Sequence, residues 1–301
     1  TGVCSMTVQE AFDKFIRSRL REGCSEKTIE SYKNLTYPLR SYLGPIFEME
    51  NLRQGMIDDF IDSLYDRKNL SRSTLASYIR NARIFLRWCQ QGRNLLYDAS
   101  LIRVPKTPKK ILRLYSPEDI QLIFDTVEAS PEWLVARNKA MIALMLDSGL
   151  RQSEVAGLTM ENVDFERKRL KVTGKGAKDR YVPLGRFSAD MLRKYLSVRP
   201  YNLPVVFLSV HGQPISCGAI KSMTGDMQKR LPFEFSSHKL RHNFATNYLV
   251  DQYYQYGHMD VYQLMSIMGH EDISTTKRYL HEAQSIVAAS SSISHLDKLF
   301  A

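Results

Sequence analysis

The chain has 301 residues, and 44% of them are hydrophobic, which supports a packed core and excludes an intrinsically disordered chain. Its formal net charge of +10 favours a polyanionic partner such as nucleic acid. The four cysteines are scattered without a CxxC pair, which argues against a zinc ribbon or a disulfide framework and favours the cytoplasm. We find no apolar run of membrane-spanning length and expect no membrane partner.

Residues 7 to about 100 show helical periodicity throughout. Thr7 and Glu10 can form a capping box for a first helix, and Ser25 is a typical N-cap for a second that ends at Gly44. Two further helices are predicted in "RQGMIDDFIDSLYDRK" and "SRSTLASYIRNARIFLRWCQQG". We therefore expect residues 1–102 to form a compact helical domain.

A basic linker is predicted at residues 103–114, in the Pro- and Lys-rich stretch "RVPKTPKKILRLY". Such a linker can cross a phosphate backbone or simply be solvated. Residues 1–110 carry 19 basic and 12 acidic side chains, a net +7, so most of the excess charge lies in the first third.

A second domain, residues 115–301, begins with a clear helix start at Ser116-Pro117. Its pattern is mainly α-helical with one strand hairpin at "RLKVTGKGAKDRYVPL". The predicted fold class is therefore mainly α with a small β-sheet, divided into two domains.

Arg151 and Glu154 open a helix after Gly149 in "LDSGLRQSEVAGL". An arginine at a helix start is electrostatically unfavourable unless an anion binds there. The alternative is a simple surface pair between Arg151 and Glu154.

Lys175 lies between two glycines at the predicted hairpin tip. An ammonium with nearby cations can donate a proton to a leaving alkoxide, although a lysine at a tip is usually just solvated.

His238, Arg241 and His242 project from one side of a helix in "SSHKLRHNFAT". Zinc is disfavoured because Lys239 stands where the glutamate of an HExxH motif would be, so no metal site is predicted. Either histidine, and His242 above all, could instead have a purely structural role.

His270 follows Gly269 at a predicted helix C-terminus in "LMSIMGHEDISTTKRYLH", and Ser274 can cap a short helix that carries Tyr279. The pKa of tyrosine is about 10, so a tyrosine attacks phosphate only where cations stabilise the phenolate. Two arginines, two histidines and a lysine could provide that stabilisation.

The four segments "GLRQSEVAGL", "VTGKGAKDRYVPL", "HKLRHNFAT" and "LMSIMGHEDISTTKRYLH" occur in an order that resembles the tyrosine recombinases of the phage-integrase and Xer kind. The resemblance covers the second domain, and the first domain resembles more loosely the helical core-binding domain of that family. One departure is "VDQYYQYGHMD", which looks several residues longer than in Xer-type proteins.

The resemblance implies a role for each matching position. Arg151 and Arg241 resemble the arginines that bind the scissile phosphate, and Tyr279 resembles the nucleophile that becomes joined to the DNA 3′-phosphate. Lys175 resembles the general acid for the leaving 5′-hydroxyl. His238 and His270 resemble the flanking histidines, one moving the nucleophile's proton and the other donating to phosphate. Glu154 resembles the acidic residue that orients this set.

The resemblance further implies strand exchange without cofactor, metal or ATP, because the phosphotyrosine stores the bond energy. It implies a homotetramer on two double-stranded DNA recombination sites, in the cytoplasm with the nucleoid. An apolar tail, "SISHLDKLF", could dock on a neighbouring subunit or on its own domain.

Two alternatives remain at this point. A type IB topoisomerase would use the same chemistry to relax supercoils as a monomer. A DNA-binding regulator would carry an idle site, although every catalytic residue type is present.

Overall fold

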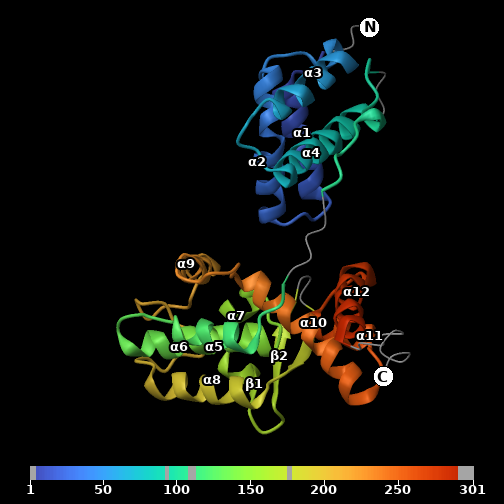
Figure 1. Ribbon diagram of the computed structural model, residues 1–301. Coiled ribbons are helices and arrows are strands. Elements are labelled where there is room, and N and C mark those ends of the chain that lie inside the picture. The colour runs from blue at the N-terminus through green and yellow to red at the C-terminus, as the bar shows by residue number, and fades with distance from the viewer. Residues whose placement is uncertain (1–4, 92–94, 108–112, 175–177, 291–301) are drawn as a thin grey trace, which may run out of the picture. The chain divides into compact units, whose positions relative to one another are not determined.

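The computed structural model describes residues 5–91, 95–107, 113–174 and 178–290 (Figure 1). The chain separates into two compact units, Thr1–Lys110 and Ile111–Ala301. Within the described ranges, no helix is both long and apolar enough to cross a membrane. The first unit contains α1 (Val8–Arg21), α2 (Glu26–Leu43), the 3₁₀ turn η1 (Met49–Asn51), α3 (Gln54–Tyr65), α4 (Arg72–Gln90) and η2 (Ala99–Leu101).

The second unit is also mainly helical, as the sequence predicts. It contains α5 (Pro117–Asp125), α6 (Glu132–Asp147), α7 (Gln152–Ala156), η3 (Met160–Asn162), β1 (Val163–Asp164), β2 (Arg169–Thr173), β3 (Asp179–Pro183), α8 (Arg186–Val198), α9 (Cys217–Gln228), α10 (Ser237–Tyr256), α11 (Val261–Met268) and α12 (Ile273–Ser290). The predicted hairpin is the antiparallel pair β2–β3, and β1 adds a short third strand that the sequence pattern did not indicate. The predicted fold class, mainly α with a small sheet, is confirmed.

The predicted caps form because their side chains satisfy backbone N–H groups that a helix start leaves unpaired. The Thr7 hydroxyl accepts from the N–H of Glu10 at 3.3 Å, and the Glu10 carboxylate accepts from the N–H of Thr7 at 3.1 Å. Ser116 forms the same reciprocal pair with Asp119 at the start of α5, and the Ser25 hydroxyl accepts from the N–H of Thr28 at the start of α2. The first unit then packs α1 and α4 around aromatic contacts, with the Phe12 and Phe85 rings 5.8 Å apart.

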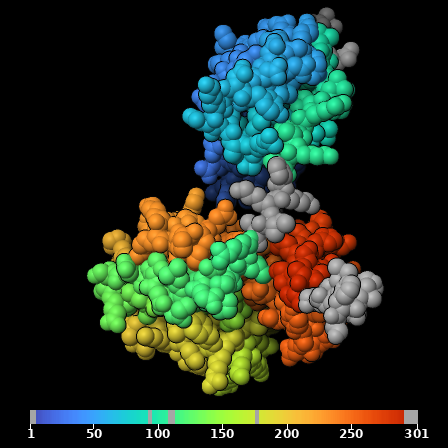
Figure 2. Space-filling model, in the orientation of Figure 1, coloured from blue at the N-terminus to red at the C-terminus, as the bar shows by residue number. Residues whose placement is uncertain are grey.

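In the second unit, α6 is buried along most of its length and packs against α8 on one side and α10 on the other. The C-terminal helices α11 and α12 pack against α10, and in Figure 2 their orange and red surface adjoins the green and yellow surface of the rest of this unit. Phe244, Leu249, Leu264 and Met268 form the apolar core between these three helices. The helix that carries Tyr279 is therefore held by α10 and α11.

Two local expectations need correction or refinement. Ser274 does not cap the Tyr279 helix: α12 begins at Ile273 and runs for 18 residues, and the Asp272 carboxylate accepts from the N–H of Ser274 at 2.8 Å. Asp272 comes first in the chain and satisfies the free N–H groups, so Ser274 falls in the first turn. The long "VDQYYQYGHMD" segment continues α10 to Tyr256, where Gly257 ends the helix in the left-handed conformation.

Gly149 links α6 to α7 with a φ of +64°, and a Cβ there would lie 2.2 Å from the Phe244 ring. We predict that Gly149→Ala lowers the free energy of unfolding by about 2 kcal/mol or more, through left-handed strain and overpacking. Gly225→Ala in the middle of α9 is the matched control, because nothing lies within 4 Å of its Cβ position. Urea unfolding of both variants measures the difference, and equal stability would contradict this view of the α6–α7 turn.

Candidate active site

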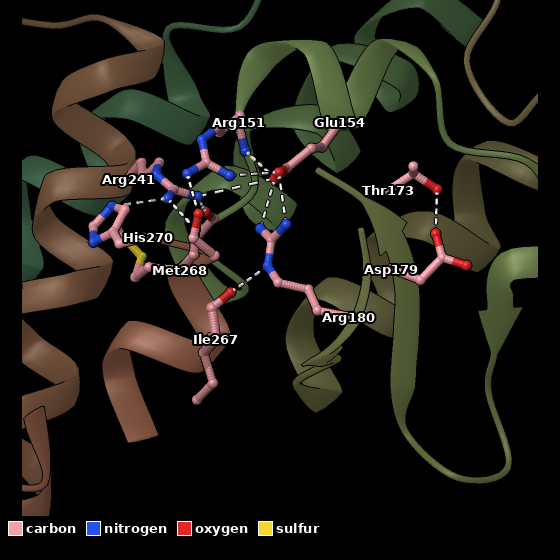
Figure 3. Close-up of polar contacts among 11 residues, drawn as sticks. Arg151, Glu154, Thr173, Asp179, Arg180, Arg241, Ile267, Met268 and His270 are labelled. Atoms are coloured by element: carbon pink, nitrogen blue, oxygen red, sulfur yellow. Dashed lines mark hydrogen bonds and ion pairs between the residues drawn. The ribbon is translucent and has the colours of Figure 1, made fainter. Parts of the chain in front are cut away.

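Arg151 stands at the N-cap of α7 and is bound to two other parts of the site (Figure 3). Its backbone N–H donates to Glu154 Oε2 at 2.8 Å, and its Nη1 donates to Glu154 Oε1 at 2.8 Å. Its Nη2 donates to the carbonyl of Gly269 at 2.8 Å. The side chain is still 34% exposed, so the guanidinium combines the pair with Glu154 and an open face toward solvent.

Glu154 lies among three arginines, Arg151, Arg180 and Arg241, and is 2% exposed. Within the described residues it is the only acidic side chain that pairs with them. Arg180 on β3 donates to both its oxygens, at 2.8 and 2.9 Å, and Arg241 Nη1 lies 3.9 Å from Oε2. Burial by itself would raise the pKa of Glu154, but the hydrogen bonds from Arg180 and Arg151 outweigh it and hold the pKa below its ordinary value. Three guanidinium groups face one carboxylate, which leaves two positive charges unmatched.

Arg241 projects from the second turn of α10 into the centre of the site. Its Nη1 donates to the carbonyl of Gly149, and its Nη2 donates to the carbonyl of Met268 at 2.6 Å. Burial lowers the pKa of Arg241 to about 10, so the group remains charged at neutral pH. The carbonyls fix the guanidinium in place and do not neutralise its charge.

His270 follows Gly269, which ends α11 with a φ of +60°. Its Nε2 lies 3.3 Å from Arg241 Nη2, and its Nδ1 lies 2.8 Å from the hydroxyl of Thr276. Burial and then the neighbouring arginines lower the pKa of His270 to about 4, so the ring is neutral at pH 7. An arginine can only donate, so Nε2 is the acceptor and Nδ1 carries the proton toward Thr276.

Tyr279 lies on α12 with its ring nearly parallel to that of His270, at 6.2 Å between centroids and 11° between planes. Its hydroxyl accepts from Arg278 Nη2 at 2.6 Å, and the residue is 1% exposed. The ring also contacts that of His242, 5.3 Å away. The phenol is therefore packed inside the unit and held by an arginine on its own helix.

His238 lies in the first turn of α10 with its side chain exposed at the surface. Partial desolvation of the ring, followed by the charges of Arg278 and Arg241, lowers the pKa of its imidazole. His242 is buried, with Nε2 2.9 Å from a carboxylate oxygen of Glu282, and burial lowers its pKa to about 4. The packing of His242 against Tyr279 fits the structural role that sequence reasoning left open for it.

The structure thus brings together most of the predicted set. Direct contacts join Arg151, Glu154, Arg241 and His270, and Tyr279 joins them through the His270 ring. His238 lies within reach of the same charges. Lys175 lies outside the described residues.

Sequence reasoning missed two residues, Arg180 and Arg278. Arg180 shares a face of β3 with the buried Val182, and an arginine on the inner face of a strand requires a partner, which is the signal that could have found it. Arg278 had no such signal, because its contact with the phenol depends on how the side chains of α12 pack.

Comparison with known proteins identifies the family. A profile described as "Phage integrase family" matches residues 113–285. The chain belongs to the phage integrase family. Tyrosine recombinase XerC of Staphylococcus epidermidis is 27% identical over 282 residues, covering 91% of this chain and 92% of the relative. XerC of Staphylococcus carnosus is also 27% identical, with the same coverage of both chains.

Solved structures share the fold. The Tn1549 transposon integrase in complex with a circular intermediate DNA superimposes with a TM-score of 0.72 at 18% identity, over 95% of this chain and all of that chain. The XerH recombinase in a post-cleavage complex with a palindromic difH substrate gives 0.70 at 19% identity, over 94% and 83% of the two chains. Together with the family match, these results make the chain a tyrosine recombinase, an enzyme of site-specific DNA recombination, and they do not favour the topoisomerase or regulator alternatives.

We predict that Glu154→Gln is less stable than the unaltered protein by about 3–5 kcal/mol at pH 7, because it removes the charge that three buried or half-buried guanidinium groups share. The pKa of Glu154 is lowered on folding, so its contribution is present above the unfolded-state pKa of about 4.3 and is lost as pH falls through the lower folded-state value. The difference between the two proteins should therefore shrink in acid.

Urea unfolding between pH 7 and pH 3 measures this difference. Asp226→Asn provides the control, because Asp226 forms an exposed pair with Lys229 on the surface. If the difference in the free energy of unfolding between Glu154→Gln and the unaltered protein stayed constant with pH, the view that a charged Glu154 stabilises the fold would be contradicted.

Proposed function

We propose that this recombinase cleaves and rejoins DNA through attack of the Tyr279 hydroxyl on the scissile phosphate. The Tyr279 Oη–P bond forms as the P–O5′ bond breaks, which leaves a 3′-phosphotyrosine and a free 5′-hydroxyl. Attack by a second 5′-hydroxyl reverses the step and joins the strands, so the phosphodiester energy is conserved in the covalent bond.

The observation that carries this proposal is the unmatched positive charge beside Tyr279. Arg151 and Arg241 come from segments 90 positions apart, yet both donate to carbonyls of the Met268–Gly269 turn. Guanidinium groups fixed in this way can bind the non-bridging oxygens and stabilise the charge that develops in a pentacovalent transition state. Glu154 orients Arg151 and offsets part of the repulsion among the arginines.

Proton transfers are assigned to the remaining residues. His238 and His270 are neutral at pH 7, and they are proposed to act as the matching histidines of the family do, one taking the phenolic proton and the other donating to phosphate. In the described conformation Nε2 of His270 accepts from Arg241 and Nδ1 faces Thr276, so either role requires that DNA binding replace one of these contacts. Lys175 is proposed to protonate the leaving 5′-oxygen, as its place in the matching motif implies.

The burial of Tyr279 adds one requirement. The phenol must leave Arg278 and turn toward the phosphate before it can attack, so cleavage includes a conformational step at α12. DNA that favours the released state would drive this step by its greater affinity for it.

The assembly proposed here follows the family. The first unit acts as the core-binding domain, the basic stretch 103–114 joins it to the catalytic domain, and four subunits act on two double-stranded sites in the bacterial cytoplasm, on nucleoid DNA. The Tn1549 and XerH neighbours were solved with DNA substrates, and the XerC relatives are bacterial, which supports this assignment. The apolar tail proposed to dock on a neighbouring subunit lies outside the described residues.

We predict that Tyr279→Phe binds DNA but forms no covalent complex, because the substitution removes only the attacking oxygen. A suicide substrate that carries a nick beside the cleavage position traps the adduct, which denaturing gel electrophoresis then detects. Tyr262→Phe is the matched control, since Tyr262 is exposed at the start of α11 and also loses one hydroxyl. An adduct with Tyr279→Phe would overturn the nucleophile assignment.

A plasmid relaxation assay and the nicked substrate test the two alternatives. A topoisomerase would relax plasmid that lacks a recombination site, and a regulator would form no adduct even with Tyr279 intact.

The first unit offers a distinct test of DNA contact. Arg80, Arg83 and Arg87 lie at i, i+3 and i+7 along α4, on one face, and Arg80 and Arg87 are exposed. We predict that Arg80→Ala and Arg87→Ala each weaken binding and reduce the slope of log K against log salt by about 0.9, the value for one lost phosphate contact.

Arg193→Ala on α8 is the control, because the Arg193 charge is already paired with Asp190. Fluorescence anisotropy across a salt series measures the slopes. If the slope of log K against log salt stayed the same in both Arg80→Ala and Arg87→Ala, neither arginine would contact a DNA phosphate, and α4 would not be part of the DNA interface.

A further inference from the structure

Arg180 binds Glu154 and the end of α11, but it is not among the groups proposed to bind phosphate or transfer protons. It lies on β3 with a side chain that is 12% exposed, and three of its nitrogens have separate partners (Figure 3). Nη1 and Nη2 donate to the two oxygens of Glu154, and Nε donates to the carbonyl of Ile267 at 2.7 Å. One side chain thus joins the sheet, the start of α7 and the last turn of α11.

The guanidinium also packs closely against the turn after α11. A Cβ at Gly269 would lie 2.9 Å from Arg180 Nη1 and 3.0 Å from its Cζ. The absence of a side chain at Gly269 therefore allows Arg180 to lie beneath the turn that leads to His270. If Arg180 moved, the turn at Gly269 would lose the guanidinium that packs against it.

Each partner of Arg180 is one contact away from a proposed phosphate-binding group. Glu154, which Arg180 grips at both oxygens, also binds the Nη1 and the backbone N–H of Arg151. Ile267 belongs to the same helix end as Met268 and Gly269, whose carbonyls accept from Arg241 and Arg151. Arg180 itself already commits both ends of its guanidinium to Glu154, so it is placed to hold these groups in position and not to bind phosphate itself.

We propose that Arg180 is a positioning residue of the recombination reaction, which fixes Arg151 through Glu154 and fixes the Ile267–His270 turn through its contacts with Ile267 and Gly269. This inference rests on the proposed function, because its effect is on the groups assigned there to the scissile phosphate.

Electrostatics supports the same role. The charged side chains that lie within ion-pair distance of Glu154 in the described residues are Arg151 at its own N-cap, Arg180 on β3 and Arg241 on α10, and the neutral His270 lies next to Arg241. The contacts with Arg180 are the strongest of those that lower the pKa of Glu154 against the effect of burial. Without Arg180, burial would raise that pKa, and protonated Glu154 could no longer accept all the hydrogen bonds that hold Arg151.

The test compares Arg180→Met and Arg180→Lys with the unaltered enzyme and with Arg169→Met. Arg169 is the matched control, because it lies on the adjacent strand β2 and its guanidinium pairs with Asp164 and lies 4.3 Å from the centre of the Tyr181 ring, neither of which belongs to the site. The measurements are DNA affinity, thermal unfolding, and the single-turnover rate of adduct formation on the nicked substrate from pH 5 to pH 9.

We expect Arg180→Met to change DNA affinity far less than the reaction rate and to form the adduct about 100-fold more slowly, as expected for misplaced catalytic groups. As the pH is lowered, the rate of Arg180→Met should begin to fall at a higher pH than the rate of the unaltered enzyme, because Glu154 takes up a proton more readily without Arg180. The double variant Arg180→Met/Glu154→Gln should be slow but should lack this acid limb. Arg180→Lys should recover part of the rate, since a single ammonium can hold one carboxylate oxygen but not all three partners.

The outcomes separate the possible failures. If the unaltered enzyme forms no adduct, the proposed function fails. If it does, but folded Arg180→Met or Arg180→Lys reacts at the parental rate, or reacts slowly with the parental pH profile, the positioning role fails. If Arg180→Met does not fold, Arg180→Lys alone decides, with a reduced rate and a shifted acid limb in support and parental behaviour against.

Discussion

The burial of one carboxylate among three guanidinium groups is the interaction on which the site depends. Like charges this close repel, and each would be costly to bury alone. Glu154 offsets one charge, and the backbone carbonyls of Gly149, Ile267, Met268 and Gly269 each accept one guanidinium hydrogen bond without neutralising the charge. The result is a rigid cluster with a net charge of +2. A phosphodiester supplies negative charge that this cluster lacks, and it supplies more as a pentacovalent transition state forms.

The same positive cluster governs the groups around it. Burial and then the charges of this cluster keep His270 neutral at pH 7, so its Nε2 can accept the hydrogen bond from Arg241. Arg278 has a different effect, because it binds the Tyr279 hydroxyl while the phenol is still buried. On the proposed mechanism, this arrangement separates a preformed phosphate-binding site from a nucleophile, Tyr279, that must first move. Such a separation limits cleavage to conditions under which the helix that carries the nucleophile is released.

Local features of this fold could be predicted from the sequence, because they depend on a few neighbouring residues. The caps at Thr7, Ser25 and Ser116 and the β2–β3 hairpin follow from short patterns, and the order of four motifs indicated the family and the catalytic domain. The start of α12 shows where such reasoning becomes uncertain, since Asp272 and Ser274 lie two positions apart, both are typical N-cap residues, and only one of them can stand at the helix start. Contacts such as Arg180 to Glu154, and the burial of Tyr279, could not be predicted, because they depend on the packing of segments distant in the chain.

The most direct test of the account is the position of the phosphate. A crystal structure of the recombinase with duplex DNA carrying its own site would locate the scissile phosphate relative to the arginine cluster. We predict that its non-bridging oxygens lie about 3 Å from the guanidinium nitrogens of Arg151 and Arg241, with Glu154 still bound by Arg180. A phosphate bound elsewhere, with this cluster facing solvent, would contradict it.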